Sequence, residues 1–506
     1  MCPALAAAGK NVKNNNEIEL GFSTVLSGPT APFETNTNAG QLLAIDMINS
    51  SDDILPGIKL IPTYSDDAGD LIPGGTGAIC LLNRGVPLII GPTYSSAAYG
   101  ACSAVGASLL PLLSPSATAA SLTKPGTDCP AFARVVASDA DQSSSLVELA
   151  VSLGWRSFSV LYISDDPYSM GLLDSVYEKA SLFDIAVAVP AKQGLSSAPS
   201  EQSMTQALKG IKSSGSRVIF SFLYPEQMAL LLPVADRLGM VGKSWAWVGS
   251  DSWIFSVVAL GERLNNPRLV SGALGTVPYI ATDSPQWSAF ASSWNAIPER
   301  ANYTQAYNFT FLDPPYSSSP NVYAAYSYDA VYFAAKALDK VLRSGRSLLD
   351  REAVYDALVA TRHDGATGEI RLNRGGDRVT TKFEILNAVD GGREARSAGI
   401  WTQGQGIQWS STNGVQFYDG TSSPPPASVT YESATNSAAS ITIGIMMVLG
   451  LITLFVCVYR KLKKDDDAKK LLRIVDQGGV KGDRETELKM IAGTFPQSPQ
   501  NASAFV

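Results

Sequence analysis

In the stretch from Leu88 to Ala98, Leu-Ile-Ile-Gly-Pro-Thr-Tyr-Ser-Ser-Ala-Ala, an apolar run passes through a Gly-Pro turn into a helix start. The stretch from Leu110 to Ala120, Leu-Pro-Leu-Leu-Ser-Pro-Ser-Ala-Thr-Ala-Ala, has the same form. A strand that is apolar throughout is covered on both faces, which is typical of parallel sheets. In such sheets, ligands bind where strands end and helix N-termini begin. The two corners therefore predict a parallel α/β fold with a binding site between them.

Strands and helices alternate on both sides of these corners. The expected strands are residues 18–25, 58–64, 87–91, 109–114, 158–164, 185–189, 218–223 and 246–250, and the expected helices are residues 39–50, 95–108, 142–153, 171–180, 204–213 and 225–238. Roughly 400 residues of this pattern exceed one sheet, so two α/β lobes are expected. Further along, residues 368–372 and 382–387 flank a Gly-rich turn and predict a β-hairpin.

Composition excludes several function classes. The net charge of −7 argues against a surface for nucleic acid, because no basic field is present to hold phosphates. His363 is the single histidine, which excludes metal sites built from several histidines and leaves only one residue for a catalytic triad. We expect His363 to be an ordinary surface residue at a helix end. The sequence predicts a binding protein, without metal or cofactor, and not an enzyme.

Three of the five cysteines fall in one segment, at Cys80, Cys102 and Cys129. No Cys-x-x-Cys pair occurs, so a zinc module is not expected. One disulfide with one cysteine left over fits this spacing, and we predict the pair Cys80–Cys102. The alternative is three small buried thiols.

The segment from Ala438 to Tyr459 carries no charged residue. At about 1.5 Å per residue, a helix of this length crosses a hydrocarbon core of about 30 Å. Arg460, Lys461, Lys463 and Lys464 follow at once, so the positive-inside rule places the C-terminus in the cytoplasm and the preceding chain outside. The sequence therefore predicts a single-pass, type I membrane protein at the cell surface. Asn-x-Ser/Thr sequons at Asn49, Asn302 and Asn308 favour an exterior, glycosylated domain.

The hydroxyl groups at the two corners suggest a site for a carboxylate. Ser95 and Ser96 open one predicted helix, and Ser116 and Thr118 follow the next strand. Hydroxyls and helix N-termini together can hold an anionic group. The competing interpretation is that these residues only cap their own helices.

Several motifs, taken in order, resemble one known family. They are Leu26-Ser-Gly-Pro, Tyr64-Ser-Asp-Asp-Ala-Gly-Asp, Ile90-Gly-Pro-Thr-Tyr-Ser-Ser, Ser116-Ala-Thr, Phe132-Ala-Arg-Val-Val-Ala-Ser-Asp-Ala-Asp-Gln, Leu153-Gly-Trp, Asp165-Asp-Pro-Tyr, Trp247-Val-Gly-Ser-Asp-Ser-Trp and Tyr326-Ser-Tyr-Asp-Ala-Val. Over about residues 17–415 they resemble the receptor-family ligand-binding region. This is the type I periplasmic-binding-protein fold of metabotropic glutamate, GABA-B and natriuretic-peptide receptor ectodomains and of leucine-type binding proteins. The resemblance implies a two-lobed clamshell that closes on a small ligand.

The resemblance also implies roles for individual residues. Ser95, with Ser96, matches the serine that holds a ligand carboxylate, and Ser116 and Thr118 match an element that touches carboxylate and ammonium. Asp139 and Asp251 match acids that face the ammonium, and Tyr168 matches the second-lobe tyrosine that covers the ligand. The competing interpretations are a lobe crossover for Asp139, a helix cap for Asp251 and a surface aromatic for Tyr168.

Glutamate receptors of this family use basic residues near the first loop to hold a second carboxylate. The loop here, Pro32-Phe-Glu-Thr-Asn-Thr-Asn, has no Lys or Arg, and Ser327 stands near the other basic position. The resemblance therefore favours a neutral or apolar amino acid, or a relative such as GABA, over glutamate. It also implies a homo- or heterodimer formed through the first lobe.

The predicted organisation has six parts. They are a signal remnant or disordered start at residues 1–16, a first lobe at 17–138 and 278–363, a second lobe at 139–277 and 364–412, a Pro/Ser stalk at 413–437, the membrane span at 438–459 and a cytoplasmic tail at 460–506. Three outputs fit this layout: a receptor that signals alone or with partners, a non-signalling binding or clearance receptor, or part of a larger class C or guanylate-cyclase receptor.

Overall fold

The computed structural model describes residues 16–28, 30–124, 126–183, 186–297, 320–412 and 414–428, with scattered positions between 453 and 470. The chain divides into one compact unit up to Thr430 and a second unit after it. Within the described residues, no helix combines the length and the apolar character needed to cross a bilayer. Apart from Thr453, the predicted span at 438–459 lies outside these residues.

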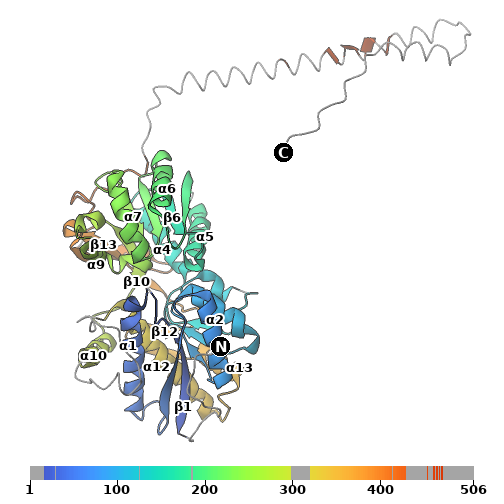
Figure 1. Cartoon of the computed structure of the whole chain (residues 1–506), viewed down its shortest axis with the longest axis vertical. Helices are drawn as coiled ribbons and strands as arrows, with labels where there is room; N and C mark the ends of the chain where they lie inside the picture. The colour runs from blue at the N-terminus through green and yellow to red at the C-terminus, as the bar shows by residue number, and fades with distance from the viewer. Residues whose placement is uncertain are drawn as a thin grey trace, which may run out of the picture. The chain divides into compact units, whose positions relative to one another are not determined.

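The first lobe is built on a five-stranded parallel sheet in the order β2-β1-β3-β4-β5. The strands are β1 (Glu17–Thr24), β2 (Lys59–Asp66), β3 (Ile89–Ile90), β4 (Leu112–Ser114) and β5 (Phe132–Arg134). Helices α1 (Ala31–Asn49) and α12 (Val322–Arg343) pack apolar side chains on one face, and α2 (Leu71–Arg84) and α3 (Ser95–Val105) on the other. Figure 1 shows this lobe with β1 running through it. The predicted parallel α/β architecture is confirmed.

The second lobe holds an eight-stranded sheet in the order β15-β14-β13-β10-β9-β8-β6-β7. The strands are β6 (Ser157–Ile163), β7 (Ala186–Leu195), β8 (Val218–Phe222), β9 (Ala246–Gly249), β10 (Leu274–Pro278), β13 (Lys382–Val389), β14 (Glu394–Thr402) and β15 (Gly406–Trp409). Helices α4 (Asp139–Ser152) and α5 (Pro167–Leu182) cover one face, and α6 (Glu201–Ser213) and α7 (Pro225–Arg237) the other. The last three strands are antiparallel.

The predicted hairpin at 368–372 and 382–387 is wrong, although both strands exist. Strand β12 (Gly368–Arg371) pairs with β11 (Arg362–Gly365), whereas β13 pairs with β10 and β14 in the other lobe. The β11–β12 pair packs on the first lobe, because Ile370 belongs to the same core as Phe22. The chain therefore returns to the second lobe just before Lys382, later than the predicted boundary at 364.

The predicted stalk at 413–437 is wrong for the part that the structure describes. Phe417 packs in the second-lobe core, with its ring 6.0 Å from that of Trp155. The indole of Trp155 also donates a hydrogen bond of 2.8 Å to the carbonyl of Pro425. The proline run is thus held against the second lobe by a buried tryptophan.

The predictions for the disulfide and for His363 are also wrong. Cys102 forms its disulfide with Cys129, which rules out the pair Cys80–Cys102. His363 lies in β11 with only 8% of its side chain exposed, stacked on Tyr332 at 5.8 Å. Helix α13 (Arg351–Val359) ends before it, so the residue belongs to a strand that faces α12.

The sequon at Asn49 has a structural use. Its amide donates to the carbonyl of Leu60 at 2.9 Å and accepts from the amide of Leu60 at 2.7 Å. This pair of bonds joins the end of α1 to β2, so the nitrogen that would carry a glycan is engaged. The sequons at Asn302 and Asn308 lie outside the described residues.

Candidate functional site

The two strand-to-helix corners, at residues 88–98 and 110–120, lie side by side and form the first-lobe wall of a cavity. The Gly91–Pro92 bond is cis, and the chain then passes Thr93 and Tyr94 into α3. Ser95 does not cap its helix, since its hydroxyl accepts a 3.2 Å bond from the amide of Ala119. The hydroxyl of Ser116 donates to the carbonyl of Thr93 at 2.9 Å. Each corner therefore holds the other in place.

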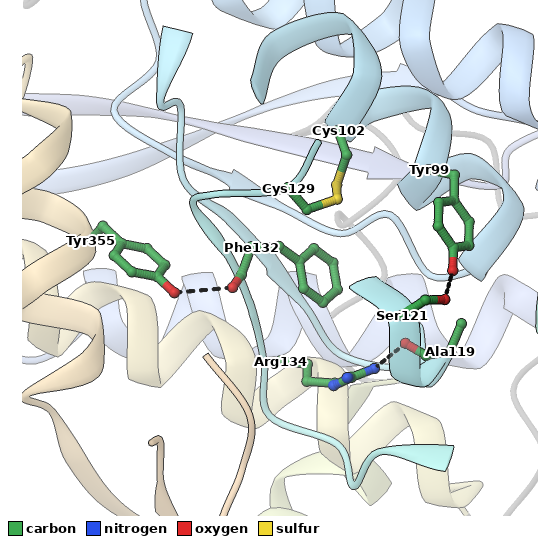
Figure 2. Close-up of a disulfide and its surroundings, with 8 residues drawn as sticks. All are labelled: Tyr99, Cys102, Ala119, Ser121, Cys129, Phe132, Arg134 and Tyr355. Atoms are coloured by element: carbon green, nitrogen blue, oxygen red, sulfur yellow. Dashed lines mark hydrogen bonds between the residues drawn. A yellow bond between two sulfur atoms is a disulfide. The ribbon is translucent and has the colours of Figure 1, made fainter. Parts of the chain in front are cut away.

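Arg134 supports this wall from below. Its buried guanidinium donates to the carbonyls of Ala117 at 3.2 Å and Ala119 at 2.9 Å, and pairs with Asp377 at 2.7 Å. Figure 2 shows the arginine side chain directed at the carbonyl of Ala119. Hydrogen bonds to two of its carbonyls restrict the motion of this loop, so the side chains of Ser116 and Thr118 are held in fixed positions.

The second-lobe wall centres on Asp251. This residue begins the short helix α8 (Asp251–Ile254), and Ser250 is the residue before it. One carboxylate oxygen accepts from the hydroxyl of Tyr168 at 3.0 Å, and the other accepts from the hydroxyl of Tyr323. Tyr168 is buried and lies beside Tyr224, with ring centroids 5.8 Å apart. The acid and these rings therefore face the cavity.

The walls enclose a cavity of about 80 Å³ between the lobes. The lobes touch directly at its rim, where the rings of Tyr94 and Tyr224 are 5.8 Å apart and those of Phe255 and Tyr323 are 5.6 Å apart. The first lobe contributes Glu34, Thr37, Thr93, Tyr94, Ser95, Ser116, Thr118, Asn321 and Tyr323, and the second Tyr168, Tyr224, Pro225, Glu226, Asp251, Ser252 and Phe255.

Five of the seven residues singled out from the sequence line this cavity, namely Ser95, Ser116, Thr118, Tyr168 and Asp251. Ser96 does not, because its hydroxyl donates to the carbonyl of Gly69 at 2.6 Å. Asp139 is fully buried beside the cavity, where the hydroxyl of Thr118 acts on its carboxyl group as a side-chain donor. Burial, and then the nearby carboxylate of Asp251, hold the pKa of Asp139 well above its usual range.

The lining of the cavity is acidic. Glu34, Glu226 and Asp251 line it, and none of its described lining residues is Lys or Arg. Burial and the carboxylate of Asp67 raise the pKa of Glu34 to about 8. Burial also raises the pKa of Asp251, although hydrogen bonds from Tyr323 and other side chains oppose the shift. Such acids favour a ligand that brings positive charge.

Sequence reasoning missed several lining residues. Tyr94 could have been predicted as a lining residue, because it directly precedes Ser95 in the sequence. Glu34 could have been found as the one charged residue in the first-loop stretch Pro32–Asn38, where only the absence of Lys and Arg was considered. Tyr224 and Tyr323 come from segments with no motif, and only the meeting of the lobes brings them to the site.

Comparison with known proteins identifies the family to which this chain belongs. The model of the family "Receptor family ligand binding region" matches residues 38–391. The chain belongs to this family. The resemblance drawn from the ordered motifs is thereby confirmed, together with the two-lobed, periplasmic-binding-protein-like fold.

Similar proteins include receptors from plants and from an amoeba. Glutamate receptor 3.1 of Oryza sativa subsp. japonica is 25% identical over 412 residues, which cover 74% of this chain and 42% of that protein. Metabotropic glutamate receptor-like protein E of Dictyostelium discoideum is 27% identical over 331 residues, 64% of this chain and 37% of that one. The chain thus matches about two fifths of each relative's length.

A solved structure shares the fold. A leucine-binding protein of Thermotoga maritima superposes with a TM-score of 0.61 at 20% identity, covering 76% of this chain and 98% of that one. The family match and the similar receptors show that the chain contains a ligand-binding domain of a receptor family related to glutamate receptors. The relatives named here are receptors and binding proteins, not enzymes.

Proposed function

We propose that the cavity binds a small zwitterionic amino acid or a close relative, and that the chain is a single-pass cell-surface receptor that responds by lobe closure. The observation that carries this proposal is the arrangement of the two walls. Hydroxyls of Ser95, Ser116 and Thr118 lie on one lobe, and Asp251 with Tyr168 lies on the other.

This arrangement suits the two charges of an amino acid. Hydroxyls at the start of α3 can donate to a carboxylate, where the helix N-terminus adds partial positive charge. Asp251 can accept from an ammonium, and the rings of Tyr168 and Tyr224 can cover it. Because the groups stand on different lobes, a bound zwitterion stabilises the closed form through contacts that the open form lacks.

Glutamate fits the cavity poorly, despite the names of the relatives. Its second carboxylate would meet Glu34 or Glu226, with no Lys or Arg among the described lining residues. Each of these acids repels a second carboxylate once it is ionised, and burial makes that repulsion stronger. A ligand without a second carboxylate is therefore the better fit.

Membrane attachment rests on the apolar segment at 438–459 with its basic flank. In this proposal the segment holds the clamshell outside the cell, and closure is passed to partners through the span. Switching a closed population from 1:99 to 99:1 requires about 5.5 kcal/mol of differential binding. A fluorescent tag after Val506 that is quenched only when the cytoplasmic side is opened supports this topology, and quenching from outside intact cells refutes it.

We also propose a dimer formed through the first lobe. Helix α2 exposes large apolar side chains, with 74% of Ile72 and 42% of Ile79 accessible. Exposed apolar groups on one helix favour contact with another protein surface. Ile72→Asp with Ile79→Asp should shift the purified chain from dimer to monomer in light scattering, whereas an unchanged mass would exclude this face.

The ligand proposal is tested by a thermal-shift screen of the purified full chain against amino acids and GABA. A ligand at about 100 times its Kd should stabilise the fold by about 2.7 kcal/mol. Thr118→Val and Asp251→Asn should abolish the shift, and Asp174→Asn, on an exposed part of α5, should preserve it. The proposal fails if no zwitterion raises the melting temperature, or if both cavity variants keep the full shift.

A further inference from the structure

Glu34 forms an end of the cavity that the amino-acid proposal does not use. It lies in the first turn of α1, only 9% of the residue is exposed, and it lines the cavity. Its Oε2 has no hydrogen-bond partner among the described residues, and the hydroxyls of Thr37 and Thr93 offset only part of the rise in its pKa that burial causes. From the opposite lobe, Glu226 in the first turn of α7 lines the same cavity, and its buried Oε1 also lacks a partner.

The neighbouring acid Asp67 is in a different state. Its carboxylate accepts from the hydroxyl of Ser23 at 2.8 Å and from the amide of Gly69 at 3.0 Å. Asp67 is therefore satisfied within the first lobe and does not line the cavity. Glu34 and Glu226 are the acids whose acceptor capacity remains open to a ligand at this end.

An aromatic row separates this end from Asp251. Tyr94 lies close to Glu34 and Glu226, since both carboxylates help to keep the pKa of its buried hydroxyl high. The ring of Tyr94 is 5.8 Å from that of Tyr224, which is 5.8 Å from that of Tyr168. Tyr168 then donates to Asp251. The row thus leads from one acidic end to the other and can cover an alkyl chain lying between them.

A buried carboxylate oxygen that accepts no hydrogen bond is costly, and a cation placed beside it removes that cost. An amine also supplies the donors that two orphaned carboxylate oxygens need. The alternative is that Glu34 stays protonated and serves a neutral ligand as a hydroxyl-like donor. The two cases differ in whether the ligand must carry a second positive charge.

We propose that the ligand is a diamino acid of the lysine or ornithine type, with its α-ammonium at Asp251 and its side-chain amine between Glu34 and Glu226. This inference rests on the proposed amino-acid site and names its ligand class. The side-chain methylenes lie along the tyrosine row, and the carboxylate is held by the hydroxyls of Ser95 and Thr118, on the wall that Ser116 ties to Thr93.

Binding of such a ligand is coupled to a proton. In the empty site the pKa of Glu34 is about 8, so the carboxyl group carries a proton at neutral pH. The ligand ammonium arrives with its own protons, and the Glu34 proton leaves to solvent. The groups that face Glu34 are Thr37 on α1, Asp67, Thr93 and Tyr94 before α3, and Glu226 on α7. None of these groups is a cation, whereas burial raises the pKa of the Glu226 carboxyl and the charge of Arg263 opposes that rise. The proton on Glu34 therefore decides the pH dependence, and affinity for a diamino acid should rise from pH 6.5 to 8.

The test is isothermal titration of the purified full chain with L-lysine and with L-norleucine, which has the same chain without the second amine. Lysine should bind more tightly than norleucine. Glu34→Gln should raise the Kd for lysine by about thirtyfold or more. The same substitution should leave the Kd for norleucine within about twofold of the wild-type value, because glutamine resembles the protonated acid. Glu178→Gln, exposed on α5, serves as the matched control and should change neither.

The outcomes separate this inference from the proposal beneath it. If norleucine or another neutral amino acid binds as well as lysine and Glu34→Gln leaves lysine unaffected, the diamino ligand is wrong while the amino-acid site stands. If no amino acid binds, both fail. Should Glu34→Gln unfold, Glu226→Gln gives the same comparison from the other lobe. Lysine titrations in buffers of different ionisation enthalpy should also report proton release, which Glu34→Gln removes.

Discussion

Tyr323 on the first lobe donates a hydrogen bond to Asp251 on the second lobe. The bond crosses the cavity, and the other oxygen of Asp251 accepts from Tyr168 within the second lobe at 3.0 Å. The acid that we propose for the ligand ammonium therefore also holds the lobes together without ligand. A ligand at this position shares Asp251 with Tyr323 or replaces Tyr323 as the donor. The free energy of closure that the ligand adds is therefore the difference between its own contacts and the hydrogen bond already present in the empty protein.

Tyr323→Phe should weaken closure of the empty protein while leaving the first lobe intact. The substitution removes one donor to a charged, buried acceptor, which typically contributes about 1.5–3 kcal/mol. Small-angle scattering of the empty protein should show a larger radius of gyration, and ligand affinity should fall.

Tyr355→Phe is the matched control for that change. Its hydroxyl donates to the carbonyl of Phe132 at 3.2 Å inside the first lobe, as Figure 2 shows. It should cost stability without changing the radius. An identical radius for Tyr323→Phe and the wild type would show that the cross-cavity bond does not hold the lobes.

Arg134→Met should destabilise the fold by about 3–5 kcal/mol, because it leaves Asp377 and two loop carbonyls without their buried partner. Urea unfolding measures this loss. Arg396→Met, which breaks an exposed pair with Glu394, should cost less than about 1 kcal/mol. Equal midpoints for the two variants would mean that the arginine does not support the Ser116–Thr118 corner.

Local pattern was sufficient to predict much of the fold. The strands and helices around the two corners are apolar or amphipathic over their own length, so their type follows from residues that are close in sequence. Helix α2 escaped prediction because Gly74, Gly75 and Gly77 weaken any helical pattern. Gly74 and Gly75 are needed where α2 lies against α3, and Gly77 is needed where α2 lies against Ser65 of β2. The glycines lower the helix propensity of α2, and the close packing that they allow offsets this cost.

Pairing over long distances was not predictable in the same way. Strands β12 and β13 are close in sequence, yet they belong to different lobes. The site shows the same division. Ser95 and Thr118 sit at strand ends that any parallel sheet brings together, whereas the hydrogen bond from Tyr323 to Asp251 depends on how two lobes meet. The disulfide also followed packing, because the end of α3 lies against the loop before β5.

Glu34→Gln should change how stability depends on pH. The pKa of Glu34 is raised from an ordinary value of 4.5 to about 8 in the fold, so the folded state holds the proton more tightly. Its stabilising contribution is complete below about pH 4.5 and is lost as pH rises through 8, by about 1.4 kcal/mol per pH unit in between. The wild type and Glu34→Gln should have similar urea midpoints at pH 5, and the variant should be more stable at pH 8.5.

Glu178→Gln provides the comparison for an exposed glutamate. Its difference from the wild type should stay small and constant across the same pH range. A Glu34→Gln difference that does not grow between pH 5 and 8.5 would show that the buried carboxyl is ionised throughout. That result would also remove the proton coupling proposed for the diamino ligand.

Gly91→Ala should be among the most damaging substitutions at the site, because two independent constraints meet there. Gly91 has a φ of +103°, and a Cβ would lie 2.0 Å from the carbonyl oxygen of Ser23 on the neighbouring strand. Gly28 has a similar φ of +91° but nothing within 4 Å of the added carbon. Gly28→Ala should therefore cost about 1–2 kcal/mol from backbone conformation alone. Gly91→Ala should cost several kcal/mol more and displace Thr93 and Ser95, so ligand affinity should fall in any fraction that folds. Equal urea midpoints for the two alanine variants would mean that β1 and the Gly-Pro corner can separate without loss.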